Sequence, residues 1–241
     1  MVAPASRKTS PLPPSPHDFW QAFVPPGTYE TDPNAGHEHG FPATLSDGRQ
    51  LLLPIRVLPG DGQHAVASLI VNQASFAVED GLAKALAELL APYAPEVIIG
   101  VPTLGLLLAS NVARRLGHAR MVPLGTSRKF WYQQNLSEPM SSITSPGQAK
   151  TLFLDPRMLP LIKGKRVAVV DDVVSSGESM LATLRLLEKV GITPAVIGCA
   201  MLQGSAWRDT LAVWEDRIVS PLSTPLLVRM PNGRWQAVDP Y

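Results

Sequence analysis

Residues 167–179, with the sequence VAVVDDVVSSGES, combine two adjacent carboxylates with a turn of small hydroxylic residues. The carboxylates of Asp171 and Asp172 follow a short apolar run that is typical of a buried strand. Ionised carboxylates only accept hydrogen bonds, so the pair suits the hydroxyl groups of a sugar or a hydrated Mg²⁺ ion. This half of the segment therefore predicts a site for a diol or a metal ion.

The other half of the segment predicts a phosphate site. Ser175, Ser176 and Ser179 supply hydroxyl donors, and Gly177 allows the backbone to approach a ligand closely. A helix that begins at this turn adds free backbone N–H groups and the positive end of its dipole, which suit a phosphate. The structural alternative is a strand that ends in acids before an ordinary helix cap. Because both halves occur together, we favour a sugar-phosphate site.

Alternating strands and helices are expected to position this segment. Short apolar runs predict strands, and apolar residues at helical spacing predict helices. In chain order these are a helix at about 74–90, a strand at 97–101, a helix at 105–116, strands at 120–124 and 166–170, a helix at 178–190 and a strand at 195–202. The alternation predicts an α/β fold with a doubly wound, mainly parallel sheet, in which ligands bind beyond the carboxyl ends of the strands.

The N-terminal part of the chain has a different pattern. Seven of the 24 prolines lie in residues 1–26, so this arm is expected to be loose or to lie extended over a neighbouring surface. Residues 41–58 predict a hairpin whose Asp47-Gly48 turn supplies positive φ angles. The helix at 74–90 is expected to bury one apolar face, formed by Val78, Leu82, Leu86, Leu89 and Leu90.

The composition excludes several classes of protein. The chain has 21 basic and 20 acidic residues and a net charge of +1, which argues against a dedicated nucleic-acid-binding protein. One cysteine excludes a disulfide framework, and no apolar run is long enough to span a membrane. His37 and His39 have the wrong spacing for a helical zinc site. Because the first residues lack a secretory signal, we expect a cytoplasmic protein.

Residues 167–179 resemble the phosphoribosyl diphosphate (PRPP) binding motif of the type I phosphoribosyltransferases. That motif has a hydrophobic strand, two acids, two hydrophobic residues, small hydroxylic residues, a glycine, any residue and then Ser or Thr. Val173 and Val174 occupy the hydrophobic positions, and Glu178 occupies the open one. The surrounding chain supports the resemblance over about residues 40–210. It implies the type I phosphoribosyltransferase core, with a small hood built from the N-terminal hairpin and the C-terminal segment.

The resemblance also implies a division of the chain. The expected parts are a Pro/Ser-rich arm at 1–27, a hood segment at 28–66, the core at 67–202 with a mobile loop at 130–155, and a C-terminal hood segment at 203–241. The mobile loop would close over PRPP and exclude water from the reacting centre. Trp131 and Tyr132 lie in this loop, where they would either contact a substrate or partner or serve packing alone.

Each half of PRPP has expected contacts. Asp171 and Asp172 would hold the ribose hydroxyls, stabilise positive charge that develops on the ring, and bind Mg²⁺ partly through water. The backbone after the first core strand would hold the diphosphate, although Leu104 stands where orotate-type enzymes carry a basic residue. The PRPP-binding residues are expected to be Thr103, Leu104, Gly105, Arg128, Lys129, Lys150, Val173, Val174, Ser175, Ser176, Gly177, Glu178 and Ser179, with Leu104 contributing its backbone amide.

The acceptor base is less well defined by the resemblance. The hairpin with Phe41 resembles orotate-type enzymes, whereas the segment with Gln203 and Trp207 resembles purine enzymes. The loop also lacks an acid between Pro139 and Leu154, where adenine-type enzymes carry a glutamate. These three residues are candidates for base binding, and a purine is favoured over a pyrimidine.

The implied activity is that of a pentosyltransferase. The enzyme would transfer the 5-phosphoribosyl group from PRPP to a nucleobase and release pyrophosphate, with Mg²⁺ as cofactor. A homodimer is expected, with no nucleic-acid or membrane partner. Two alternatives stay open: a PRPP- or nucleotide-sensing regulator with a degenerate transferase site, and a salvage accessory protein that binds a nucleotide product.

Overall fold

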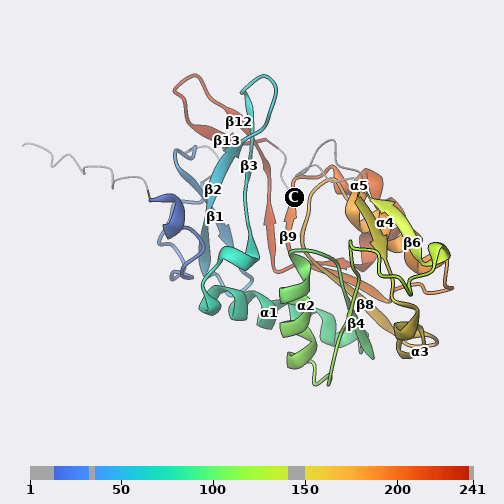
Figure 1. Cartoon of the computed structure of the whole chain (residues 1–241). Helices are drawn as coiled ribbons and strands as arrows, with labels where there is room; N and C mark the ends of the chain where they lie inside the picture. The colour runs from blue at the N-terminus through green and yellow to red at the C-terminus, as the bar shows by residue number, and fades with distance from the viewer. Residues whose placement is uncertain (1–13, 33–35, 141–149, 239–241) are drawn as a thin grey trace, which may run out of the picture.

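The computed structural model describes residues 14–32, 36–140 and 150–238. Its central element is a parallel sheet with the strand order β10-β9-β8-β4-β5, and β11 also pairs with β9 (Figure 1). The strands are β4 (Val97–Gly100), β5 (Val122–Pro123), β8 (Val167–Val174), β9 (Val196–Gln203), β10 (Ile218–Val219) and β11 (Leu222–Thr224). Every pair in this sheet is parallel, which confirms the predicted α/β class.

Helices cover both faces of the parallel sheet (Figure 1). Buried residues of α1 (Phe76–Leu90) and α2 (Gly105–Arg115) pack on one face, and those of α4 (Glu178–Glu188) pack on the other. The prediction for Leu89 was wrong, because its side chain is 39% exposed. The buried stripe of α1 follows an i, i+4 spacing, and Leu89 lies beside it.

The remaining helical elements are short. They are α3 (Leu159–Ile162), α5 (Trp207–Thr210) and the 3₁₀ turns η1 (Pro16–Asp18), η2 (Val71–Gln73), η3 (Ala91–Tyr93), η4 (Gln134–Leu136), η5 (Pro156–Met158) and η6 (Ala212–Arg217). In the described part of the chain, no helix has the length and apolar character needed to cross a membrane.

The strand that carries the acidic pair is longer than predicted. We expected it to end at residue 170, but β8 continues through both carboxylates to Val174. Asp171 pairs with Cys199 and Val174 pairs with Leu202. The acids therefore lie in the last four residues of β8, at the carboxyl edge of the sheet, where β8 pairs with β9.

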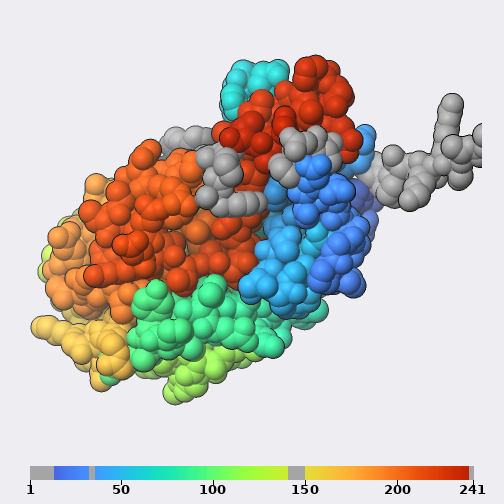
Figure 2. Space-filling view, turned by 180° about the vertical axis from the view of Figure 1, so that it is seen from behind, coloured from blue at the N-terminus to red at the C-terminus, as the bar shows by residue number. Residues whose placement is uncertain are grey.

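A second sheet forms the hood. Its order is β1-β2-β3-β12-β13, all antiparallel, with β1 (Gly40–Thr44), β2 (Gln50–Val57), β3 (His64–Ala67), β12 (Leu226–Arg229) and β13 (Trp235–Ala237). Figure 2 shows the N-terminal and C-terminal parts of the chain side by side in this unit. The predicted hairpin is confirmed, except that only Gly48 of its turn has a positive φ.

Two boundaries differ from the sequence interpretation. Residues 218–224 were assigned to the hood, but they pair with β9 in the parallel sheet. Residues 130–155 were expected to be one mobile loop, but β6 (Ser137–Met140) and β7 (Lys150–Phe153) form an antiparallel hairpin there. Residues 141–149 of that expected loop lie outside the described residues. A hairpin was missed because its two strands are only four residues long and carry no clear alternation.

The described part of the N-terminal arm packs on the hood. Phe19 and Trp20 are buried, and the indole N–H of Trp20 donates to the carbonyl of Ser68 at 2.9 Å. This agrees with an arm that lies over a neighbouring surface. Residues 1–13 of the arm lie outside the described residues.

Candidate active site

Both members of the acidic pair at the carboxyl edge of the sheet have raised pKa values. Asp171 and Asp172 are both buried, and the backbone N–H of Asp172 donates to Oδ1 of Asp171 at 2.8 Å. Burial raises the pKa of Asp171 well above its usual range, and the neighbouring Asp172 charge adds to this effect. Burial also raises the pKa of Asp172. Two buried carboxylates in contact are costly to ionise unless a positive charge joins them.

The chemistry of this pair fits a magnesium ion that arrives with a substrate. Within the described residues, neither Asp171 nor Asp172 has a basic side chain as an ion-pair partner. The same part of the chain contains no cluster of three or more His, Cys, Asp or Glu side chains that could form a complete metal site. Mg²⁺ commonly binds one or two carboxylates and completes its shell with waters and substrate phosphates. The pair is suited to that mode of binding.

The turn after β8 leads directly into α4. Gly177 is the N-cap of this helix, with φ +84°, a conformation that L side chains rarely adopt. Glu178, the first residue of α4, is exposed. The first turn of α4 thus presents backbone N–H groups beside the acids, as a phosphate site requires.

The structure gives a second reason for a glycine at position 177, in addition to the predicted close approach of a ligand. A Cβ there would lie 3.0 Å from Cγ of Leu211 and 3.1 Å from Cβ of Thr210. The glycine is therefore needed for contact with the chain itself, at the end of α5, as well as for its backbone angle.

The loop between β4 and α2 lies against the acidic pair. The backbone N–H of Val101 donates to the carbonyl of Val170 at 3.0 Å, which joins the loop to β8. Thr103 and Leu104 are exposed, whereas Gly105 is buried against Asp171. No side chain caps the first turn of α2, so its N–H groups remain available near the predicted diphosphate position.

The predicted basic pair follows the next strand, β5. The backbone N–H of Leu124 donates to the carbonyl of Gly100 at 3.0 Å, so the segment after β5 starts beside the loop after β4. Arg128 and Lys129 are exposed in this segment. Three neighbouring strands, β8, β4 and β5, therefore bring the acidic pair, the two helix N-termini and the basic pair to one edge.

The other predicted residues are spread more widely. Lys150 is half-buried at the start of β7, in the hairpin that packs on α4. The amide of Gln203 donates to the carbonyl of Ala67 at 2.7 Å and joins β9 to the hood. Trp207 is only 4% exposed, and its N–H donates to the carbonyl of Gly204. The structure therefore places Trp207 among the buried residues, and its role in base binding stays a prediction.

Phe41 lines a pocket of about 560 Å³ at the junction of the hood and the core. The other lining residues are Thr31, His37, Pro42, Thr44, Ser46, Pro221 and Ser223. The ring of Phe41 meets the ring of His37 edge-on, with centroids 4.9 Å apart. Burial lowers the pKa of His37, and the charge of Arg234 lowers it further. The histidine is therefore neutral near pH 7 and offers one donor and one acceptor.

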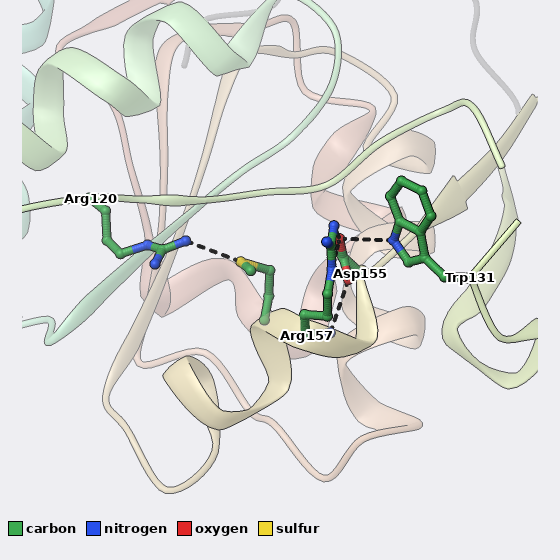
Figure 3. Close-up of polar contacts among 5 residues, drawn as sticks. Arg120, Trp131, Asp155 and Arg157 are labelled. Carbon is green, nitrogen blue, oxygen red and sulfur yellow. Dashed lines mark hydrogen bonds and ion pairs between the residues drawn. The ribbon is translucent and has the colours of Figure 1, made fainter. Parts of the chain in front are cut away.

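A second polar cluster lies at the base of the β6–β7 hairpin (Figure 3). Asp155, buried just after β7, accepts hydrogen bonds from the side chain of Arg157 and from Nε1 of Trp131 at 3.3 Å. Sequence reasoning missed Asp155, although an acid directly before Pro156 is a recognisable start of a short helix. Its contact with Trp131 could not be read from the sequence pattern.

The geometry defines a phosphoribosyltransferase core, and comparison with known proteins places the chain in that class. Residues 67–216 match the family model of the phosphoribosyl transferase domain, so the chain belongs to this family. It is a pentosyltransferase of the type I phosphoribosyltransferase group, as the motif at 167–179 predicted.

Individual relatives are more distant. The chain is 28% identical over 176 residues to the adenine phosphoribosyltransferase of Acidiphilium cryptum, which covers 67% of this chain and 90% of that protein. It is 28% identical over 143 residues to the same enzyme of Rhodospirillum centenum, covering 56% and 75%. A crystal structure of the Giardia lamblia enzyme in complex with 9-deazaadenine matches with a TM-score of 0.54 at 22% identity, covering 70% of this chain and 93% of that one. This structural match supports the fold.

Proposed function

We propose that this phosphoribosyltransferase transfers the 5-phosphoribosyl group from PRPP to a purine base, with adenine as the first candidate. The main support for the proposal is that the loops following β8, β4 and β5 lie at the same edge of the sheet, because these three strands are parallel neighbours. Together they offer acids for a ribose, helix N-termini for phosphates and cations for a diphosphate. The similarity to adenine phosphoribosyltransferases supports the choice of base.

In this proposal each part of the edge has one task. The N–H groups at the start of α4 hold the 5′-phosphate, and Asp171 and Asp172 hold the ribose hydroxyls. The loop at 102–105, with Arg128 and Lys129, holds the diphosphate. Mg²⁺, bound by the acidic pair, would neutralise charge on the leaving diphosphate.

The chemical step is a displacement at the anomeric carbon of PRPP. A ring nitrogen of the base supplies the electron pair of the new C–N bond, and the C–O bond to the diphosphate breaks with its electrons on oxygen. The base then loses its N–H proton. Positive charge develops on the ribose ring as the C–O bond lengthens, and the buried carboxylates lie where they can stabilise it. Most of the rate enhancement would come from positioning and electrostatics.

The pocket beside Phe41 is our proposed place for the base. Ser223 of β11, which lines the pocket, pairs with Leu202 of β9, and Leu202 pairs with Val174 of β8. This lining residue therefore lies two strands, or about 10 Å, from Val174, which precedes the predicted phosphate turn at 175–177. Among its described lining residues, none carries a charge near neutral pH. Hydroxyl groups and a neutral imidazole suit an uncharged heterocycle, whereas orotate would bring a carboxylate without a cation.

The test is pyrophosphate release with PRPP, Mg²⁺ and a panel of adenine, guanine, hypoxanthine, xanthine, orotate and uracil. We expect turnover with adenine and none with orotate. Turnover with orotate alone would contradict the pocket assignment. Binding of PRPP without release for any base would indicate a sensor instead of an enzyme. We also propose a homodimer, which size-exclusion chromatography with light scattering can check directly.

A further inference from the structure

The segment that carries the two predicted cations is an arch fixed at both ends. This basic arch comprises residues 125–132. At one end, Gly125 and Phe153 of β7 exchange two backbone hydrogen bonds, of 3.0 and 2.8 Å. At the other end, the backbone N–H of Tyr132 donates to the carbonyl of Lys129 at 3.0 Å and closes a turn. Arg128 and Lys129 lie exposed between the two ends.

Asp155 fixes the second end of the basic arch through Trp131. The carboxylate accepts the indole N–H of Trp131 at 3.3 Å, and the guanidinium of Arg157 lies over the indole ring at 4.7 Å. Arg157 also donates to the same carboxylate through its side chain and its backbone N–H. The indole is therefore held at its edge by Asp155 and on its face by Arg157 (Figure 3).

The hydrogen bond between Trp131 and Asp155 anchors the turn through a polar side-chain contact. Phe130, the neighbour of Trp131, is 98% exposed, and its ring meets the Trp131 ring edge-on with centroids 4.7 Å apart. Tyr132 adds a looser ring contact with Phe153, with centroids 5.8 Å apart. The direction in which Lys129 and Arg128 leave the turn therefore depends on how Trp131 and its ring contacts are held.

The charged side chains around the basic arch fall into a paired and an unpaired group within the described residues. Arg157 lies close enough to neutralise Asp155, and hydrogen bonds from Arg157 lower the pKa of that carboxyl to about 2. Arg128 and Lys129, in contrast, form no ion pair with any described residue. Within the described residues, Arg157 therefore pairs with Asp155, whereas Arg128 and Lys129 can pair with a ligand at the sheet edge.

We propose that Asp155 is a positioning residue for PRPP: by holding Trp131, it aims Arg128 and Lys129 at the diphosphate. The basic arch starts one strand away from the loop at 102–105, beside which the diphosphate is placed. This inference rests on the proposed function. Asp155 itself does not touch the substrate, so its loss should weaken PRPP binding without affecting a ligand that lacks the diphosphate.

The experiment compares calorimetric affinities for PRPP with Mg²⁺ and for AMP. Asp155→Asn should weaken PRPP binding at least fivefold and change AMP binding less than twofold. Trp131→Phe, which keeps an aromatic ring but removes the N–H donor, should act in the same direction and replaces Asp155→Asn if that variant does not fold. In an Arg128→Ala/Lys129→Ala background, adding Asp155→Asn should weaken PRPP binding less than twofold further.

Glu96→Gln is the matched control. Like Asp155, Glu96 accepts a hydrogen bond from a backbone N–H, that of Arg166 at 3.0 Å, and it forms an ion pair with Lys165. Glu96 lies at the amino end of β4, the end of the strand opposite to the candidate site. Its PRPP affinity should equal that of the wild type. Equal weakening of PRPP and AMP by Asp155→Asn, or a full Asp155→Asn effect in the Arg128→Ala/Lys129→Ala background, would overturn the positioning role. A wild type that binds no PRPP would overturn the proposed function together with it.

Discussion

Gly105, the first residue of α2, lies directly against Asp171 of β8. A Cβ on Gly105 would come within 2.6 Å of Oδ1 and 2.7 Å of Cα of Asp171. Gly105→Ala must therefore push α2 away from β8, which we expect to cost about 1–3 kcal/mol of unfolding free energy. It should also weaken PRPP binding, because it separates the loop at 102–105 from the acidic pair. Urea unfolding and calorimetry measure the two effects.

Gly125→Ala is the control for this substitution. A Cβ on Gly125 would meet no heavy atom within 4 Å, and its backbone hydrogen bonds to Phe153 do not depend on the side chain. Its unfolding free energy should stay within about 0.5 kcal/mol of the wild-type value. If Gly105→Ala were equally neutral, the close packing of α2 on Asp171 would have no energetic consequence.

The acidic pair should matter more for turnover than for stability. Asp171→Asn and Asp172→Asn keep the side-chain shape but remove a carboxyl whose ionised form is disfavoured by burial and has no cationic partner within the described chain. We expect turnover to fall at least tenfold, about 1.4 kcal/mol of transition-state stabilisation. The melting temperature should not fall, because each variant replaces a carboxyl that is costly to ionise in the folded protein by a neutral amide. AMP binding should change less than PRPP binding.

Initial rates of pyrophosphate release and thermal unfolding separate these effects. Asp80→Asn, which removes an exposed carboxylate paired with Arg115, is the matched control and should keep wild-type turnover. If both active-site variants turned over normally, the carboxylates would have a structural role alone.

Much of the fold could be predicted from the sequence because its signals are local. The apolar run before Asp171 and the Gly177 turn are contained within one segment, and both were found. The extension of β8 through the acids could not be predicted, because it depends on pairing of Asp171 with Cys199 in a distant strand. Charged residues also weaken any strand pattern.

In the candidate site too, local features could be predicted from the sequence, whereas contacts between distant residues could not. The positions of the acids and of the phosphate turn follow from one motif. The contact between Asp155 and Trp131 spans 24 residues, and that between Gly105 and Asp171 joins two elements of different type. Neither leaves a periodic pattern in the sequence. The burial of Trp207 could not be predicted either, since residue type alone does not distinguish a buried indole from an exposed one.

Two glycine substitutions can separate the cost of a positive φ angle from the cost of a crowded Cβ. Gly177→Ala must accept φ near +84° and also place its Cβ 3.0 Å from the Leu211 side chain. Gly117→Ala has a similar angle, φ +80°, with no neighbour within 4 Å. The angle alone costs about 1–2 kcal/mol, so Gly117→Ala should lose about that amount of unfolding free energy. Gly177→Ala should lose more, and it alone should weaken PRPP and AMP binding.

Substitutions beside Gly177 test the phosphate site without disturbing the turn. Ser179→Ala should weaken PRPP and AMP binding alike by about 1 kcal/mol, the value of one hydrogen bond. Glu178 is exposed, so Glu178→Gln should bind both ligands equally well or slightly better. Normal AMP binding by a folded Gly177→Ala protein would mean that the phosphate lies elsewhere.

The last prediction concerns the pH dependence of stability that Asp155 confers. Its pKa is about 2 in the folded protein against 3.8 for an unperturbed carboxyl, chiefly because Arg157 donates hydrogen bonds to the charged form, with a further one from Trp131. A folded-state pKa below the unfolded value stabilises the protein above pH 4, and this stabilisation is lost as the pH falls from about 4 towards 2. Asp155→Asn should therefore lower the unfolding free energy by about 1–2 kcal/mol at pH 7 and by progressively less below pH 4. Urea unfolding at a series of pH values measures the difference, with Glu88→Gln on the exposed side of α1 as the control that should match the wild type throughout. A difference for Asp155→Asn that stayed constant down to pH 2.5 would show that the carboxylate charge does not stabilise the fold.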